Sequence, residues 1–227
     1  MDNKLLYEII CCFIFAIIDI AFIWRYDIKR NNSSKELQIY LKETSIIKKL
    51  YLISSVLVLI ILAIALHYIY GSSNSMIFNI KRIALVSVLY VAAYTDFKNM
   101  IIPNGLILTG GGYWCVLAVL EVIFERDLFL DRIVAEMIAV FVIIIMCALC
   151  LVIVKNGVGM GDVKLLLLMS LFQGIDGIAG SIFMSLLVAF VISIVLLASH
   201  KKNRKDAIPF APSIIIGSFI SIILLGV

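Results

Sequence analysis

Eight long apolar runs dominate this sequence, and each approaches the length of about 20 residues with which an α-helix crosses a bilayer. They cover residues 7–24, 50–70, 80–96, 103–124, 133–154, 163–179, 180–199 and 212–226. The runs are continuous and lack the alternation of polar and apolar residues that a membrane β-strand requires, which favours helices. A turn at residues 173–177 separates the sixth run from the seventh. The sequence therefore predicts an all-α integral membrane protein with about eight transmembrane helices.

Composition supports the same class. Hydrophobic residues make up 63% of the chain and charged residues 15%, whereas soluble domains carry about 45–50% and about 25%. The net charge of +4 does not indicate nucleic-acid binding, because Lys and Arg lie between the apolar runs rather than in one patch. The first run contains Glu8 and Asp19 and precedes no small-residue cleavage pattern, so we interpret it as a retained helix rather than a signal peptide.

The distribution of Lys and Arg predicts the orientation of the helices. One set of alternate loops contains 14 of the 19 basic residues, and the opposite set contains Lys4, Lys81, Arg82, Arg126 and Arg132. Since cytoplasmic loops are enriched in Lys and Arg, the richer set is assigned to the cytoplasm and both termini to the outside. We therefore expect a multi-pass protein of the cytoplasmic membrane, with the bilayer as its surroundings.

Ionisable residues near spanning helices are candidates for function because their burial in lipid is costly. Glu8, Glu121 and Asp176 lie near the predicted outer ends of their helices, where we expect water to reach them. Glu136 is spaced four residues from Arg132, so these two side chains can pair on one helix face.

Asp96 and Asp162 are different, because each lies at a predicted cytoplasmic helix end in unusual local sequence. Asp96 closes the third apolar run, and Pro103 follows as an early residue of the fourth helix. Asp162 follows Gly157, Gly159 and Gly161, which permit close backbone approach. Structural interpretations exist for both. Asp96 can pair with Lys98, and Asp162 can cap the sixth helix.

Two carboxyl groups at the same depth suit peptide hydrolysis. Like-charge repulsion keeps one proton between them, so one group can activate water and the other can protonate the leaving nitrogen. No metal or other cofactor is predicted. The two histidines, His67 and His200, are assigned to opposite membrane sides. The cysteines all lie in apolar runs, where helix packing is the favoured interpretation: Cys11, Cys12, Cys115, Cys147 and Cys150.

Three motifs resemble those of the type IV prepilin peptidases, the bacterial branch of the Gly-x-Gly-Asp membrane aspartic proteases. The first is Asp96 followed by Pro103 and Asn104. The second is the run from Gly159 through Gly161 and Asp162 to Lys164 and Leu165. The third, Ile208-Pro209-Phe210-Ala211-Pro212, precedes the last helix and has Ala211 where glycine is commoner. The resemblance covers about residues 83–226, six of the eight helices.

The resemblance implies that Asp96 and Asp162 are the catalytic pair. It implies that Gly159, Gly161, Lys164, Pro103, Asn104 and Pro209 shape the site or bind substrate. The implied reaction removes the short basic leader of a prepilin-like or pseudopilin protein at the cytoplasmic face, in type IV pilus assembly or protein secretion. The implied division is an N-terminal two-helix region, residues 1–79, and a six-helix peptidase core, residues 80–227.

The N-terminal region departs from the family pattern. Many members carry two Cys-x-x-Cys pairs between the first two helices, associated with zinc and with N-methylation of the product. The segment 25–49 contains no cysteine, so the resemblance implies no zinc and does not extend to N-methylation. Residues 33–49 are predicted either as an amphipathic surface helix or as a solvated linker.

Two other functions are compatible with parts of the sequence. A presenilin-like protease shares the Gly-x-Gly-Asp motif, but it lacks the Ile102-Pro103-Asn104 continuation and cuts inside the membrane. An ion-coupled transporter with two cation-binding aspartates is the alternative from another class. Such sites use broken helices near the bilayer centre, whereas Lys155 and Lys164 place this glycine-rich segment at the surface.

Overall fold

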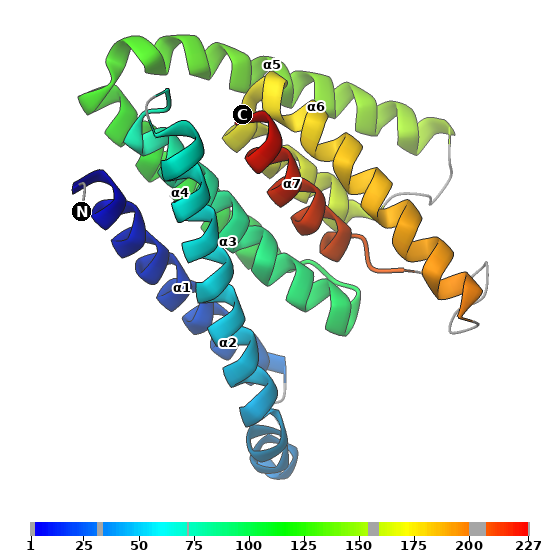
Figure 1. The fold of residues 1–227 in the computed structure, drawn as a ribbon. Helices are drawn as coiled ribbons and strands as arrows, with labels where there is room; N and C mark the ends of the chain where they lie inside the picture. Colours follow the sequence, from blue (N-terminus) through cyan, green and yellow to red (C-terminus); the bar gives the residue numbers. More distant parts are fainter. Residues whose placement is uncertain (1–2, 31–33, 72, 154–158, 200–207, 227) are drawn as a thin grey trace. The chain divides into compact units, whose positions relative to one another are not determined.

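A computed structural model of the chain describes residues 3–30, 34–71, 73–153, 159–199 and 208–226, and within them not the side chains of 27–30, 34–49 and 52. These residues form seven helices and no strand (Figure 1). The helices are α1 (Asn3–Arg30), α2 (Ser34–Tyr70), α3 (Met76–Asn99), α4 (Asn104–Phe124), α5 (Arg126–Ile153), α6 (Met160–Ala198) and α7 (Ala211–Leu225). Helices α1 to α6 each contain a span long and apolar enough to cross a membrane, and α7 is shorter. The all-α membrane class is confirmed.

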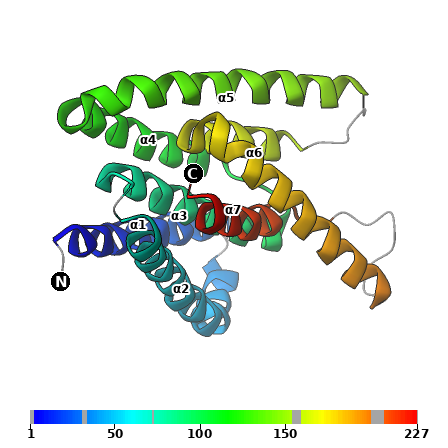
Figure 2. The ribbon, with the colours of Figure 1, turned by 45° about the horizontal axis from the view of Figure 1, so that its top comes forward.

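The predicted count of eight helices is not confirmed, because the sixth and seventh runs form one element, α6. The backbone of α6 leaves helical geometry at Gly174, with φ 62° and ψ −171°, and α6 changes direction along its length (Figure 2). Residues eight apart in a straight helix lie about 12 Å apart along the axis. The Gln173 Nε2 atom nevertheless donates a hydrogen bond to Ser181 Oγ at 2.8 Å. The turn predicted at residues 173–177 thus coincides with a sharp bend.

Helix α2 begins sixteen residues earlier than the predicted second span. Residues 34–49 are mixed in charge, but they contain neither Gly nor Pro and are rich in Lys, Glu and Leu, which are good helix formers. The helix therefore continues from the polar segment into the apolar run. The segment is helical, as the first of the two interpretations expects, and the side chains that would make this helix amphipathic lie outside the described residues.

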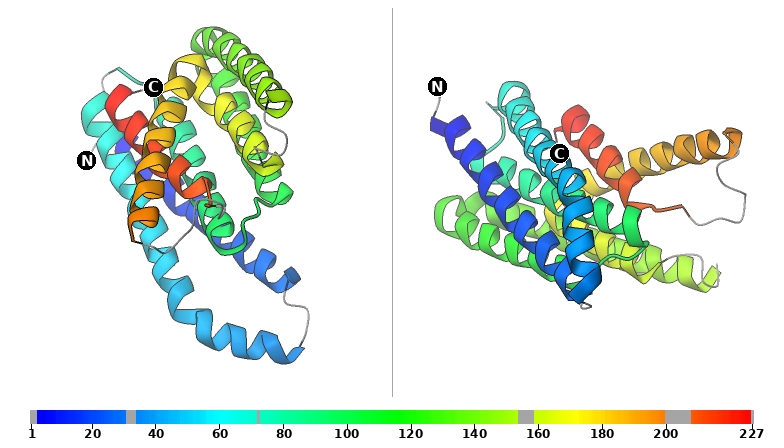
Figure 3. Two further views of the ribbon diagram at one scale, coloured as in Figure 1. Left: turned by 90° about the vertical axis from the view of Figure 1, so that its right-hand side faces the viewer. Right: turned by 90° about the horizontal axis from the view of Figure 1, so that it is seen from below.

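The helix contacts divide the chain into two units, residues 1–87 and 88–227, with the boundary inside α3. The domain boundary predicted at residue 80 stays a prediction. In the first unit α1 packs against α2 (Figure 3), and Lys4 Nζ donates to the carbonyl oxygens of Gly71 and Asn74 at 2.9 and 2.7 Å. Glu8 is fully buried and accepts a hydrogen bond from Asn79 Nδ2 at 2.8 Å, so the expectation that water reaches it is wrong.

In the second unit α6 is the central element and contacts α4, α5 and α7. Small residues make its contact with α7 close, as is common between helices in membranes. A Cβ atom added at Gly217 of α7 would overlap the backbone of Ser185, and one added at Gly180 would lie 2.9 Å from Ser221 Oγ. This close packing fixes where α7 begins relative to α6.

A buried polar cluster joins α4 to the first turns of α5. The Arg132 guanidinium lies 2.9 Å from Glu121 Oε1 and 3.4 Å from Glu125 Oε2. Trp114 Nε1 donates to Glu136 Oε2 at 3.0 Å. Glu121 is fully buried, so the expectation of water access is wrong for this residue too. The Glu121 carboxylate can be buried in its ionised form because the Arg132 guanidinium lies beside it.

Candidate active site

Asp96 and Asp162 come together at one end of the second unit, where α3 ends and α4, α6 and α7 begin. We call this the aspartate end. Asp96 lies in the last turn of α3 and is 7% exposed, and Asp162 is the third residue of α6 and is half-buried. Their carboxyl groups are near enough to repel each other electrostatically. The fold thus places two carboxylates, 66 positions apart in sequence, at one site.

The third motif supplies a hydrogen bond to the first aspartate. The backbone N–H of Ala211, the first residue of α7, donates to Asp96 Oδ2 at 3.0 Å. Ala211 is buried, and a buried N–H requires an acceptor. This contact therefore holds the Asp96 side chain against the start of α7, a role that sequence reasoning did not assign to Ala211. Pro209 lies two residues earlier and is half-buried.

The turn between α3 and α4 is short because the chain reverses within residues 100–103. Met100 ends α3 in the left-handed region with φ 53°, and its N–H donates to the Asp96 carbonyl oxygen at 2.8 Å. Pro103 occupies the N-cap position of α4 with φ −67°, so it immediately precedes the helix in which the sequence predicted it as an early residue. The turn keeps Asn104 close to the end of α3.

The glycines around Asp162 lie in two close contacts. A Cβ atom added at Gly159 would lie 3.0 Å from Asp162 Oδ2, and one added at Gly161 would lie 3.2 Å from Ile102 Cβ. Gly159 thus leaves room for the carboxylate, and Gly161 lets α6 approach the α3–α4 turn. Gly157 lies outside the described residues.

The N-cap interpretation of Asp162 is wrong. The N-cap of α6 is Gly159, with no capping side chain, and Asp162 is already inside the first helical turn. The other structural interpretation was that Asp96 pairs with Lys98. The Nζ atom of Lys98 lies 5.5 Å from the centre of the Tyr94 ring. Lys98 is exposed whereas Asp96 is buried.

Lys164 connects α6 with α4 at the same end. Its Nζ donates to Asn104 Oδ1 at 2.8 Å, in an exposed contact. Five of the eight predicted site residues are thus linked at this end: Asp96 and Asp162 through their charges, Gly159 and Asp162 through the space that the missing Cβ leaves, and Lys164 and Asn104 through a hydrogen bond. Among the described residues no three His, Cys, Asp or Glu side chains form a metal-binding group.

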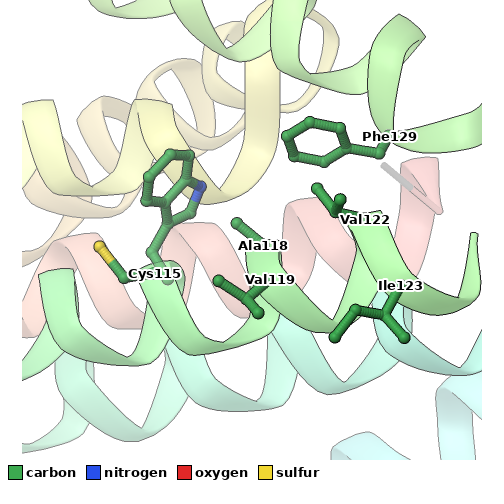
Figure 4. Close-up of a pocket in the computed structure, with 7 residues that line it drawn as sticks. Cys115, Ala118, Val119, Val122, Ile123 and Phe129 are labelled. Carbon is green, nitrogen blue, oxygen red and sulfur yellow. The ribbon is translucent and has the colours of Figure 1, made fainter. Parts of the chain in front are cut away.

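A cavity of about 350 Å³ lies away from this site, beside the other half of α4 (Figure 4). Its walls are Trp114, Cys115, Ala118, Val119, Val122, Ile123 and Phe129. Cys115 lies about 16 Å along the helix from Asn104 at 1.5 Å per residue. No ionisable group lines this cavity besides the cysteine thiol, so it offers none of the acid–base groups that hydrolysis requires.

Comparison with known proteins gives the same family as the motifs. The chain is 26% identical over 139 residues to the prepilin leader peptidase/N-methyltransferase of Bacillus subtilis (strain 168), a match that covers 61% of this chain and 53% of that protein. The match therefore spans about half the length of this curated relative. No solved structure matches the chain. A sequence model of the type IV leader peptidase family matches residues 83–198, which is slightly more than half of the chain and includes Asp96 and Asp162. The chain belongs to the type IV leader peptidase family, whose members are membrane peptidases.

Proposed function

We propose that this protein is an aspartic endopeptidase of the cytoplasmic membrane that removes the short basic leader of prepilin-like or pseudopilin proteins. The observation that carries the proposal is the meeting of three separate sequence motifs at the aspartate end. Asp96, Asp162 and Ala211 come from α3, α6 and α7; the Ala211 N–H donates to Asp96, and the charge of Asp96 acts on Asp162.

The proposed reaction uses one ionised and one protonated carboxyl group. The ionised carboxylate takes a proton from a water molecule, whose oxygen forms a bond to the carbonyl carbon of the scissile peptide. The protonated carboxyl donates to the carbonyl oxygen. When the C–N bond breaks, a proton passes to the leaving nitrogen, which gives a free carboxylate and a free amine. Atoms and charge balance without any further reactant.

The surroundings of the two aspartates differ, and they support a reaction in which one carboxyl group is held in place and the other is accessible. Asp96 is buried and held by the Ala211 N–H, so its position is set by the fold. Asp162 is more exposed and follows the glycine-rich segment, so substrate and water can approach from its side. A general acid or base must lie within hydrogen-bond reach of the proton it transfers.

The proposed cytoplasmic location rests on the Lys and Arg distribution. The name of the Bacillus subtilis relative supports a leader peptide as the substrate. The proposal covers cleavage and leaves out N-methylation, because the segment 25–49 contains no cysteine and the match spans only half of that relative.

The test is cleavage of a co-expressed prepilin-like protein by the wild type, Asp96→Asn and Asp162→Asn. We expect both variants to lose cleavage by at least about 10²-fold, the lower end of what general acid–base catalysis contributes. Processing at the wild-type rate in either variant would remove that aspartate from catalysis.

Asparagine is preferred to alanine at position 96 for a structural reason. The amide oxygen of the asparagine in Asp96→Asn would still accept the Ala211 N–H, whereas Asp96→Ala leaves that buried donor without its acceptor, at a cost of about 1–3 kcal/mol. Thermal unfolding in detergent should therefore show Asp96→Asn close to the wild type and Asp96→Ala less stable. Loss of cleavage in the stable variant then reports on chemistry rather than on folding.

A further inference from the structure

Helix α4 and the first part of α6 pack against each other and run in the same direction away from the aspartate end. Their common direction follows from their contacts, because the residue numbers of the partners rise together along both segments. We call this line of contacts the α4–α6 seam. Its pairs are Ile102 with Gly161, Asn104 with Lys164, and Gly110 with Leu168.

The seam connects the two segments that carry the aspartates. Asp96 is joined to Ile102 through the short α3–α4 turn, in which the Met100 N–H donates to the Asp96 carbonyl oxygen at 2.8 Å. Asp162 directly follows Gly161, and a Cβ atom added at Gly161 would lie 3.2 Å from Ile102 Cβ. The separation of the helices at this end of the seam therefore helps to set the distance between the two carboxyl groups.

The two ends of the seam are held in different ways. At the far end, a Cβ atom added at Gly110 would lie 2.5 Å from Leu168 of α6 and 3.3 Å from Val88 of α3, so three helices pack closely around this glycine. At the aspartate end, Lys164 Nζ donates to Asn104 Oδ1 at 2.8 Å. Gly110 lies about 9 Å along α4 from Asn104 at 1.5 Å per residue. The hydrogen bond thus joins α4 to α6 where the aspartates lie.

The side chain of Lys164 points away from the aspartate pair. Lys164 and Asp162 are two positions apart, which corresponds to about 200° around a helix of 3.6 residues per turn, so their side chains leave α6 on opposite faces. Lys164 lines an apolar groove between α4, α5 and α6, together with Ile107 and Leu167 among others. Its influence on the reacting groups therefore passes through the backbone of α6 rather than through direct contact.

We propose that Lys164 and Asn104 are positioning residues that close the α4–α6 seam and thereby hold the two carboxyl groups within reach of one substrate bond. The proposal rests on the proposed function and adds a role that does not require contact with the substrate. Opening the seam at the aspartate end would move Asp162 away from Asp96, and a displacement of about 1 Å at a reacting group costs about 10²-fold in rate. Because the hydrogen bond is exposed, its loss should lower turnover more than stability.

The first test measures kcat and KM for a purified prepilin-like substrate with Lys164→Met, Asn104→Ala and the double variant. We expect each single variant to lower kcat roughly tenfold, less than a displacement of 1 Å would, and to leave KM unchanged. The double variant should be no slower than either single variant, because both changes remove the same interaction. The reciprocal exchange, Lys164→Asn with Asn104→Lys, should recover most of the lost kcat.

The matched control is Lys98→Met. Lys98 follows Asp96 by two positions, as Lys164 follows Asp162, and it is exposed, so this variant removes the same charge from the same end. Its kcat should equal that of the wild type. A lower kcat in Lys164→Met with full activity in Asn104→Ala would show that Lys164 acts through its charge. A change confined to KM would show that it binds the substrate. Either result would overturn the proposal.

A distance measurement separates this proposal from the proposed function. Spin labels are attached at Phe97→Cys and Met160→Cys, which are exposed positions close to the two aspartates, with serine at the native cysteine positions. We expect Lys164→Met to lengthen or broaden the distance between the labels and Lys98→Met to leave it unchanged. An unchanged distance in Lys164→Met would overturn the proposal even if turnover fell. If the wild type cleaves nothing, the proposed function fails, and the distance still shows whether this pair closes the seam.

Discussion

The two aspartates of the candidate site lie at helix ends of opposite polarity. Asp96 is near the C-terminus of α3 and is held by the first N–H of α7, and Asp162 is in the first turn of α6. A Cβ atom added at Gly159 would lie 3.0 Å from the Oδ2 atom of Asp162. The position of this carboxylate therefore depends on the absence of a single methyl group.

We predict that Gly159→Ala lowers cleavage roughly tenfold, because a displacement of about 1 Å at a reacting group costs about 10²-fold and this one is smaller. Gly159 has φ −69° and ψ 134°, which alanine adopts without strain, so the unfolding temperature should stay close to that of the wild type. The matched control is Gly112→Ala, whose Cβ meets open space. Wild-type turnover in Gly159→Ala would show that the carboxylate moves without consequence.

The sequence predicted the members of the site but not all of its contacts. Asp96, Asp162 and the three motifs were identified because their residues and spacing are unusual beside membrane helices. The hydrogen bond from Ala211 was not predicted, since a backbone donor carries no signature in sequence. The burial of Glu8 and Glu121 was also missed, because their partners Asn79 and Arg132 lie on other helices and helix periodicity does not specify such pairings.

At the scale of helices, Gly174 decides the path of α6. Its φ and ψ of 62° and −171° lie in a region that is essentially restricted to glycine. The nearest atom to an added Cβ is Ala135 Cβ at 3.5 Å, which is an ordinary contact. Any cost of a side chain at this position therefore comes from the backbone rather than from crowding.

We predict that Gly174→Ala destabilises the protein by about 1–3 kcal/mol, the usual cost of forcing a side chain into such a backbone region. Gly112→Ala, in the regular part of α4, should instead stabilise it by up to about 1 kcal/mol. Reversible unfolding in mixed detergent micelles measures both variants. If Gly174→Ala were as stable as Gly112→Ala, the bend would not require glycine.

Helix boundaries were predictable where apolar runs meet breakers. Helix α7 was predicted over 212–226 and covers Ala211–Leu225, because Pro212 and Gly226 mark its ends. The start of α2 was not predictable from apolarity, since its first residues are polar and the helix continues through them. The bend in α6 was placed correctly from Gly174 and Gly177. Whether the two apolar runs on either side of it form one helix or two depends on the three-dimensional geometry of the bend.

At the scale of the whole molecule, the function depends on which side of the membrane the aspartate end faces. Helix α4 has 21 residues and is about 32 Å long at 1.5 Å per residue, enough to cross a hydrocarbon core of about 30 Å. Its two ends therefore lie on opposite sides of the bilayer. Lys98 and Lys164 flank the aspartate end, and Arg126 and Arg132 flank the other. Locally these charges balance, so the orientation rests on the excess of basic residues in the remaining loops of the first set.

We predict that alkaline phosphatase, which is active only outside the cytoplasm, is inactive when fused after Asn99 and active when fused after Phe124. We expect the basic loops to keep the aspartate end inside because cytoplasmic loops retain Lys and Arg, and α4 then to carry the second fusion point across the bilayer. Green fluorescent protein at the same two positions is the complementary control, since it should fluoresce only after Asn99. The reverse pattern would place Asp96 and Asp162 on the outer surface. A leader that remains in the cytoplasm would then never reach them, and an outward-facing dyad would have to act on a different class of substrate.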